Sequence, residues 1–289
     1  MKKILLISLL TLALVGCGTS AQGEREFDKT KDITLVSRED GSGTRGAFIE
    51  LVGIEEKDGN GNKVDRTSQE AIIANKTDVM MQNITSDMNA IGYISLGSLN
   101  DTLKALEVDG VSPSVENIQS GSYKVARPFN VVFGDILSDV AQDFMDYILS
   151  KDGQSVVSQN GYISVETTSE YTSKNLKGKI VIAGSSSVSP LMEKIAEAYQ
   201  ALNESVTIEI QTTDSTVGVL SAIDGTVDIG MASRNLKDDE LSQINHKAIA
   251  IDGIVVVVNN DNPLTNVSSE DLKEIYLGNI KTWETLISE

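Results

Sequence analysis

Runs of apolar residues separated by polar, glycine-containing loops follow one another along most of the chain. Runs with the β-branched composition of buried strands occupy residues 33–38, 90–96, 179–183 and 248–258. Helical spacing of apolar residues marks 138–150 and 191–202, and a further short helix is expected over 68–74. The alternation of strands and helices predicts an α/β fold.

The first of these strands ends in a glycine-punctuated loop of a kind that suits an anion. Gly41 and Gly43 allow a tight turn and bring backbone N–H groups close to a ligand. Ser42 and Thr44 add hydroxyl donors, and the following helix start adds unpaired N–H groups and the positive end of its dipole. Arg38 supplies a planar fork of donors that matches a tetrahedral oxyanion. Such a loop is equally common as a simple turn with an N-cap, so the loop alone does not distinguish an anion-binding site from a structural turn.

The chain repeats this strand, hydroxyl and helix junction. The strand at 179–183 is followed by a glycine and a serine cluster, and then by a helix. The strand at 206–211 passes through a Thr- and Ser-rich segment into a third helix over 217–223. A short strand over 227–233 ends in another hydroxyl. Because strand ends and helix starts of an α/β sheet meet at one edge, the repeats favour an anion-binding site.

The N-terminus has the pattern of a secretory signal. A basic start precedes an apolar run over 4–15 that is shorter than the roughly 20 residues of a membrane span. The run ends in Leu-Val-Gly-Cys17, which resembles the lipobox of bacterial lipoproteins. We therefore expect a signal peptide over 1–16, lipidation of Cys17 and a polar tether over 17–32. Cys17 is the only cysteine, so no disulfide framework is expected.

Charge and composition exclude several kinds of partner. The formal net charge of −18 argues against nucleic acid and against direct binding to an anionic bilayer surface. An anion site in this chain must therefore work through local dipoles and donors. The 289 residues suffice for two α/β lobes, and the polar segment 166–179, which lacks an apolar period, is expected to be a linker.

An enzyme would need more than the serines provide. With Ser42 or Ser186 as a nucleophile a base is required, and the only histidine, His246, lies in a polar segment distant in sequence. The chain has no GxSxG motif, no metal-ligand spacing of His, Cys or carboxylates, and no P-loop lysine. No catalytic residue, metal or cofactor is therefore expected.

Five segments together resemble the signature segments of bacterial phosphate-binding proteins, the extracytoplasmic receptors of high-affinity phosphate ABC importers. These segments are 38–44, 184–190, 228–233, 252–259 and 280–283. The resemblance implies a two-lobed, type II periplasmic-binding-protein-like α/β fold with a hinge and a ligand cleft between the lobes. It also implies a lipid-anchored receptor on the outer face of the cell membrane, whose partners are inorganic phosphate and the membrane permease of the transporter.

The segments stand in a different order from the family pattern, because those that usually come first begin near Lys179. The chain therefore resembles a circular permutant in which 166–179 joins the former ends. The expected lobes are 33–100 plus 261–289, built from both chain ends, and the contiguous stretch 101–260. Both cuts would fall in polar surface segments, where permutation is tolerated.

The resemblance also implies the contacts of the anion and leaves its selectivity open. The implied ligand-binding residues are Arg38, Ser42, Gly43, Thr44, Ser186, Ser187, Ser215 and Ser233. Arg38 would be the one positive charge, oriented by Asp40. Other members of the family have an aspartate, which accepts the phosphate proton, where this chain has Ser233. Asp252 is the first candidate for that acceptor here and Asp214 the second.

Two other functions stay open from the sequence. The same fold could serve as a receptor for another oxyanion, such as sulfate, molybdate or tungstate. A serine-dependent hydrolase is the second alternative, and it would need a base that the sequence does not place near the serines.

Overall fold

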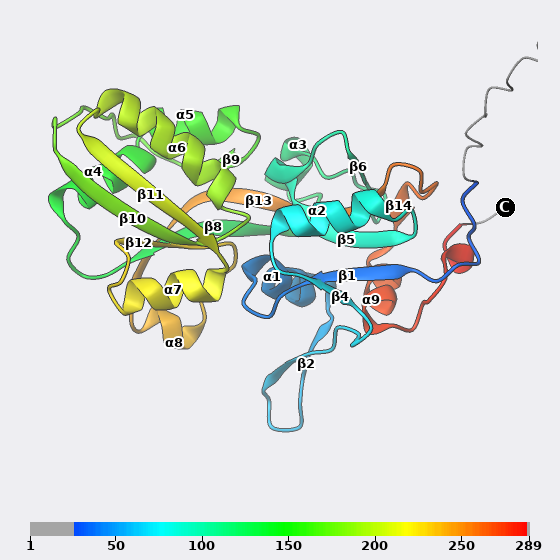
Figure 1. Cartoon of the computed structure of the whole chain (residues 1–289). Helices are drawn as coiled ribbons and strands as arrows, with labels where there is room; N and C mark the ends of the chain where they lie inside the picture. The colour runs from blue at the N-terminus through cyan, green and yellow to red at the C-terminus, as the bar shows by residue number, and fades with distance from the viewer. Residues whose placement is uncertain (1–25, 288–289) are drawn as a thin grey trace, which may run out of the picture.

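Two main hydrophobic cores, each accompanied by a smaller cluster, organise the chain into two lobes, which lie side by side in Figure 1. The structure, a computed structural model, describes residues 26–287, so Cys17 and the expected signal peptide lie outside the described residues. One core contains Phe48, Tyr93 and Trp283, and the other contains Phe144 and Tyr199. We call the first the end lobe, because both ends of the described chain belong to it, and the second the middle lobe.

The end lobe combines strands with helices from the beginning and the end of the chain. Its elements are β1 (Thr34–Arg38), α1 (Gly43–Val52), β2 (Glu55–Lys57), β3 (Lys63–Asp65), β4 (Ile72–Ala74), α2 (Thr77–Ser86), β5 (Ala90–Ser95), η1 (Leu96–Ser98), β6 (Leu103–Ala105), β7 (Glu107–Val108), α3 (Val115–Gln119), β14 (Asn266–Val267), α9 (Ser269–Leu277) and η2 (Trp283–Thr285). The hairpin of β2 and β3 projects from the body of this lobe (Figure 1).

The middle lobe holds most of the remaining elements, with helices on both faces of its sheet (Figure 1). The elements here and at its border are β8 (Ala126–Phe133), α4 (Asp139–Ile148), α5 (Lys151–Gln159), β9 (Ile163–Ser164), β10 (Gly178–Ser185), α6 (Ser189–Leu202), β11 (Val206–Thr213), α7 (Ser215–Ile223), β12 (Ile229–Ala232) and α8 (Asp238–Leu241). The predicted helices over 138–150 and 191–202 correspond to α4 and α6.

One long strand, β13 (Asn245–Asn259), runs through both lobes (Figure 1). Its first part pairs antiparallel with β8, up to the pair Gly253 and Ala126. From Ile254 onward it pairs with β5, and further along also with β6. The strand order is therefore β11-β10-β12-β8-β13-β5-β1-β4, with β13 as the continuous connection between the two halves.

The packing moves the lobe boundary away from the expected position at residue 101. Leu106, Tyr123 and Val258 belong to the core of the end lobe, together with residues from both chain ends. The reason is sheet pairing: the second part of β13 is hydrogen-bonded to β5, so it and its neighbours share the end lobe's core. Residues 101–125 and 254–260 thus lie with the end lobe.

The two ends of the described chain lie together. Ile33 N–H donates to the carbonyl of Lys281 at 2.7 Å, and Asp32 forms an isolated bridge with Thr282. Phe27 packs edge-on against Trp283, with ring centroids 6.0 Å apart. The last part of the expected tether is therefore held against the folded body, because an aromatic side chain at position 27 finds an apolar partner there.

Residues 166–177 cross the middle lobe as an irregular strap that is tied to α4. The Tyr171 hydroxyl donates to Asp143 Oδ2 at 2.8 Å, and Lys174 Nζ lies 3.1 Å from Asp143 Oδ1. Asp143 is fully buried, so these two strap residues complete the surroundings of a carboxylate inside the lobe. The predicted linker extended to residue 179, whereas Gly178 and Lys179 already belong to β10, and the strap packs more closely than a free linker.

Local expectations were met at the long apolar runs and failed at one short segment. The strands expected over 90–96 and 248–258 correspond to β5 and β13. The helix expected over 68–74 is wrong: the segment is a turn followed by β4, which pairs parallel with β1. Sheet pairing overrides local helix spacing here. Among the described helices, none has the length and apolarity needed to cross a membrane.

Candidate functional site

A group of buried hydroxyls lies where the two lobes touch. We call Thr44, Thr77, Ser185, Ser186, Ser187, Ser215 and Ser233 the hydroxyl cluster; each of these residues is no more than 5% exposed. They lie at or next to the starts of α1, α2, α6 and α7 and at the end of β12. The three junctions picked out from the sequence therefore converge, as helix starts at one edge of a sheet do.

The cluster is held together across the lobe boundary. Thr44 Oγ1, in the end lobe, lies 2.8 Å from Ser187 Oγ and 3.3 Å from Ser233 Oγ in the middle lobe. Arg38 Nη2 donates to Ser186 Oγ at 3.0 Å. The backbone adds a further link, because Thr216 N–H donates to the Gly41 carbonyl at 3.2 Å.

The expected serines occupy distinct places in this arrangement. Ser215 Oγ accepts from the Ser233 N–H at 3.0 Å and lies 3.4 Å from Ser233 Oγ. Ser42 is the N-cap of α1, and its side chain accepts from Arg45 N–H at 3.3 Å. Ser42 is buried beside the cluster without a hydrogen bond to its members within the described residues.

Gly43 is required by close approach of the two lobes. A Cβ atom at this position would lie 2.4 Å from Ser215 Oγ and 2.8 Å from Ser233 Oγ. Atoms of a real side chain do not come this close, so any other residue would push α1 away from the serines of the middle lobe. The glycine thus sets how near the two halves of the cluster can come.

Arg38 contacts the cluster through Ser186 and Thr77, and the carboxylate that orients it is not the expected one. Its Nε and Nη2 donate to the two carboxylate oxygens of Glu39, each at 2.8 Å. Asp40 was expected in this role and is the wrong residue: it pairs with Arg45 at 2.8 Å and its side chain is 96% exposed. Strand β1 ends at Arg38, so the alternation of side chains between the two faces ends there, and the turn that begins at Glu39 brings its carboxylate to the guanidinium.

A second guanidinium, which the sequence analysis missed, lies behind the cluster. Arg127, on β8, is 3% exposed and donates through Nη2 to Thr44 Oγ1 at 3.1 Å. Its Nη1 forms a salt bridge with Asp252, which lies directly opposite on β13. Arg38 is therefore not the only positive charge at the site. The sequence did carry a signal for this residue: Arg127 lies in a mostly apolar strand, and a buried charged side chain requires a partner.

Thr77 and Ser185 were also missed. Thr77 Oγ1 lies 3.3 Å from both Ser186 Oγ and Ser187 Oγ, and it accepts from Arg38 Nη1 at 3.4 Å. Ser185 Oγ donates to Ser233 Oγ at 2.9 Å. Ser185 belongs to the serine cluster seen in the sequence. Thr77 had no local signal, because α1, the β2–β3 hairpin and β4 separate it from the loop at 41–44.

The two candidate proton acceptors lie outside direct hydrogen-bonding contact with the cluster. Asp252 is 1% exposed and is engaged by Arg127, with a longer contact of 3.4 Å from the Gly97 N–H. Burial raises the pKa of Asp252 and lowers the pKa of Arg127, while their attraction opposes both shifts. Asp214 caps α7, accepting from Val217 N–H at 2.9 Å.

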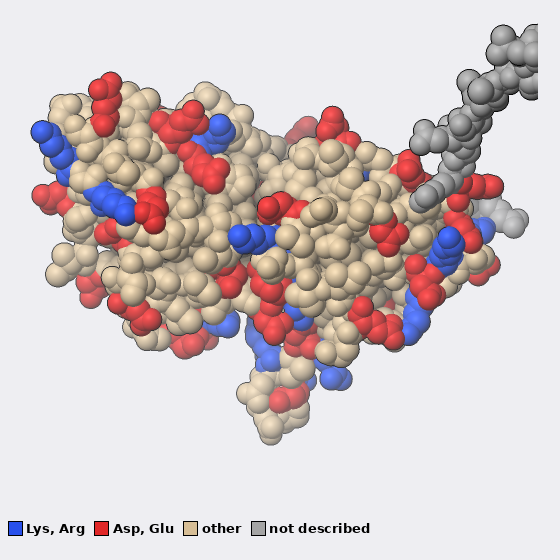
Figure 2. Space-filling view, in the orientation of Figure 1, with Lys and Arg blue, Asp and Glu red and all other residues tan. Residues whose placement is uncertain are grey.

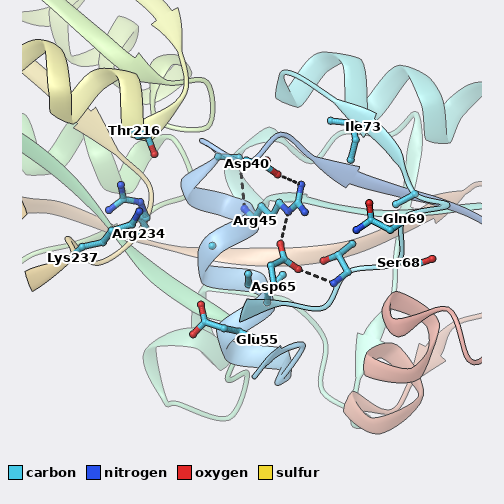
Figure 3. A pocket seen from close by; sticks show the side chains of 15 residues that line it. Asp40, Arg45, Glu55, Asp65, Ser68, Gln69, Ile73, Thr216, Arg234 and Lys237 are labelled. Atoms are coloured by element: carbon cyan, nitrogen blue, oxygen red, sulfur yellow. Dashed lines mark hydrogen bonds and ion pairs between the residues drawn. The ribbon is translucent and has the colours of Figure 1, made fainter. Parts of the chain in front are cut away.

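A cavity of about 550 Å³ opens next to Ser42 and is lined by both lobes (Figure 3). Arg45, Arg234 and Lys237 line it together with acidic side chains that include Asp65. Arg45 Nε pairs with Asp65 at 2.8 Å, and Arg234 forms two bonds of 2.7 Å with Glu240. Of the described residues that line this cavity, none is a member of the hydroxyl cluster, and several of the charged groups in its wall are paired with one another or with neighbouring carboxylates.

Acidic side chains outnumber basic ones in the sequence, 42 to 24. Figure 2 shows Asp and Glu side chains spread over both lobes, with Lys and Arg interspersed, in keeping with the formal net charge of −18. The lone histidine, His246, is exposed on β13 and pairs in register with Val132, away from the hydroxyls. Within residues 26–287 no group of three His, Cys, Asp or Glu side chains is placed to hold a metal ion.

Comparisons with known proteins point to one family. The model of the PBP superfamily domain matches residues 23–152 and 169–288. Phosphate-binding protein PstS 2 of Streptococcus agalactiae serotype V is 50% identical, with 99% of each chain covered, and PstS 2 of Streptococcus pneumoniae serotype 4 is 45% identical with the same coverage.

A solved structure supports the same relationship. The phosphate-binding protein of a phosphate ABC transporter from Streptococcus pneumoniae TIGR4 superposes with a TM-score of 0.70 at 48% sequence identity. The match covers 89% of this chain and all of that one. The chain therefore belongs to the PBP superfamily and, within it, to the family of the streptococcal phosphate-binding proteins.

Proposed function

We propose that this protein is an extracytoplasmic receptor that binds inorganic phosphate in the hydroxyl cluster and delivers it to the permease of an ABC importer. The observation that carries the proposal is the direct contact of the cluster across the lobe boundary. Thr44 and Arg38 in the end lobe meet Ser187 and Ser186 in the middle lobe. A ligand bound among these groups would hold the two lobes together. Lobe closure would then distinguish the ligand-bound receptor from the ligand-free one.

The chemistry of the cluster suits a small oxyanion in an acidic protein. Hydroxyls and guanidinium groups are hydrogen-bond donors, and donors aimed at one point stabilise an anion locally. Each guanidinium is paired with a carboxylate, Arg38 with Glu39 and Arg127 with Asp252. The site therefore presents strong donors with little net charge, which is compatible with both binding and release.

We propose a receptor rather than an enzyme. A serine nucleophile needs a base within hydrogen-bonding reach. In the part of the chain that the structure describes, no imidazole contacts the hydroxyl cluster, and His246 is exposed on β13. The relatives named above carry the names of binding proteins, which agrees with this proposal.

A receptor for another oxyanion is the second candidate, and one observation favours it. Among the described residues no carboxylate oxygen hydrogen-bonds to a member of the hydroxyl cluster. A proton acceptor is what distinguishes phosphate, which keeps a proton at neutral pH, from sulfate. The same donor set would accept a fully ionised anion.

Isothermal titration of the delipidated protein with phosphate, sulfate and molybdate decides between these candidates. We expect phosphate to bind most tightly, with sulfate as the nearest competitor. Tighter binding of sulfate or molybdate would assign the receptor to that anion. Heat changes with none of the three would contradict the oxyanion site itself.

We also propose that Cys17 carries the lipid that holds the receptor at the membrane. The support is the lipobox-like Leu-Val-Gly-Cys sequence and the position of Cys17 ten residues before Phe27, which packs against Trp283. Cys17→Ser should move the protein from the membrane fraction to the medium while phosphate binding is retained. Retention of the substituted protein in membranes would contradict the proposal.

The permuted segment order is a further part of the proposal, supported by the closeness of the chain ends. Ile33 bonds to Lys281, so a short linker could join the chain near these two residues. A re-permuted protein should begin at Glu166, to retain Tyr171 and Lys174 on Asp143, and should end at Val165. We expect it to fold and bind phosphate with unchanged stoichiometry. Failure to fold would argue against a permuted origin.

A further inference from the structure

Arg127 is held rigidly at the meeting point of the two lobes. Its Nε donates to the Ser233 carbonyl at 3.1 Å, and its Nη1 donates to the Gly253 carbonyl at 3.2 Å and to the Asp252 carboxylate. The guanidinium also lies over the Phe129 ring, 5.0 Å from the ring centroid. With these contacts on three sides, the group cannot turn away from its remaining partner.

That remaining partner is the hydroxyl of Thr44, at the start of α1 in the other lobe. Arg127 Nη2 donates to Thr44 Oγ1 at 3.1 Å, and both residues are buried. A hydroxyl has one proton to give and two lone pairs, whereas a guanidinium can only donate. The bond therefore occupies a lone pair of Thr44 and leaves its proton for the side that faces Ser187 and Ser233.

Arg38 makes the same arrangement on the other side of the cluster. Its Nη2 donates to Ser186 Oγ at 3.0 Å, which leaves the Ser186 proton free to point inward. The backbone does so for Ser215, whose Oγ accepts from the Ser233 N–H at 3.0 Å. Thr44, Ser186 and Ser215 thus each accept an N–H hydrogen bond, so the protons of these hydroxyls are available for donation to a ligand inside the cluster.

We propose that Arg127 is a positioning residue of the anion site: by donating to Thr44 it commits that hydroxyl to donate its own proton to the bound oxyanion. The proposal rests on phosphate binding in the hydroxyl cluster. Asp252 has the supporting role of holding the guanidinium in place and balancing its charge. Arg127 bonds Ser233 in one lobe and Thr44 in the other. The direction in which the Thr44 hydroxyl donates therefore depends on contact between the two lobes.

A thermodynamic cycle on phosphate affinity tests this assignment. Arg127→Gln combined with Asp252→Asn removes the donor and its counter-charge together, and Thr44→Val removes the hydroxyl at nearly constant shape. We expect the paired change to weaken phosphate binding about tenfold or more in the native background. In the Thr44→Val background the same change should cost less than about threefold, since coupled residues are not additive.

Rescue and a matched pair separate positioning from a general structural effect. In a Thr44→Ser background, where a hydroxyl is kept, the paired change should again cost about tenfold. Arg234 and Glu240 form a second buried ion pair that makes no bond to Thr44. Arg234→Gln combined with Glu240→Gln should therefore act additively with Thr44→Val.

The outcomes have distinct meanings. Equal losses from the Arg127 pair with and without the Thr44 hydroxyl would overturn the positioning role. If the paired variant fails to fold, Arg127→Lys, which keeps a charge beside Asp252, takes its place in the same cycle and is judged by the same criterion. Native protein that binds no phosphate would overturn the proposed function, whereas binding with an additive cycle would overturn this inference alone.

Discussion

The two buried guanidinium–carboxylate pairs of the site are built in opposite ways. Arg38 and Glu39 are neighbours in sequence at the end of β1, and the Glu39 side chain is 18% exposed. Arg127 and Asp252 come from distant parts of the chain and face each other across β8 and β13, both almost fully buried. The first pair is local and reaches solvent; the second exists only because two strands pair in one register.

The difference decides what each pair contributes. If Arg38 is removed, Glu39 can be hydrated, so the loss falls mainly on the anion contacts. If one partner of the Arg127 and Asp252 pair is removed, the other keeps a charge in a buried place, which is strongly unfavourable. We therefore expect the local pair to control binding and the distant pair to control both stability and binding.

Arg38→Ala should give the largest effect on phosphate affinity. Hydrogen bonds to a charged group contribute about 1.5–3 kcal/mol each, and the loss of two corresponds to at least about a hundredfold weaker binding. Titration calorimetry measures the change, and urea unfolding should show only a modest loss of stability. An affinity loss no greater than that of Ser42→Ala would mean that hydroxyl and backbone dipoles, rather than the guanidinium, carry the site.

Asp252→Ala should be the most destabilising substitution at the site. It leaves Arg127 buried without its counter-charge, and breaking such a pair costs about 3–5 kcal/mol of unfolding free energy. Arg38→Ala instead leaves Glu39, whose side chain is 18% exposed and can be hydrated, so its cost should be about 1 kcal/mol or less. Urea denaturation of both variants makes the comparison. Equal losses would show that burial does not distinguish the two pairs.

Replacing the distant pair by apolar residues should separate its two roles. In Arg127→Met combined with Asp252→Leu no charge is left unpaired, and such replacements are often neutral or stabilising. We expect stability within about 1 kcal/mol of the native protein, together with about tenfold weaker phosphate binding. Unchanged affinity would indicate that the pair serves only to hold β8 and β13 together.

Ser42→Ala should have the smallest effect. Ser42 is the N-cap of α1 and accepts from Arg45 N–H, so its loss should cost about 1 kcal/mol of stability. No bond joins Ser42 to the hydroxyl cluster among the described residues, and phosphate affinity should fall less than about tenfold. Thermal unfolding and calorimetry provide the two numbers. A loss comparable to that of Arg38→Ala would place Ser42 in direct contact with the anion.

Expectations based on short sequence segments agree well with the structure at the loops. The anion-type loop at 41–44 and the serine cluster at 185–187 meet in the structure, because each is a strand end followed by a helix start. Such junctions are recognisable from a few adjacent residues. The orientation of Arg38 shows the limit of this approach: spacing suggested Asp40, whereas the turn brings Glu39 to the guanidinium.

The alternation of strands and helices, the hydroxyl-rich junctions and the resemblance to the phosphate-binding proteins could all be predicted from the sequence, because each depends on residues close together in the chain. Tertiary structure alone decided that Arg127 faces Asp252, that Thr77 joins the cluster and that residues 101–125 pack with the end lobe. These features depend on strand register and on the passage of β13 through both lobes, and a strand's own residues do not specify which strand it will pair with.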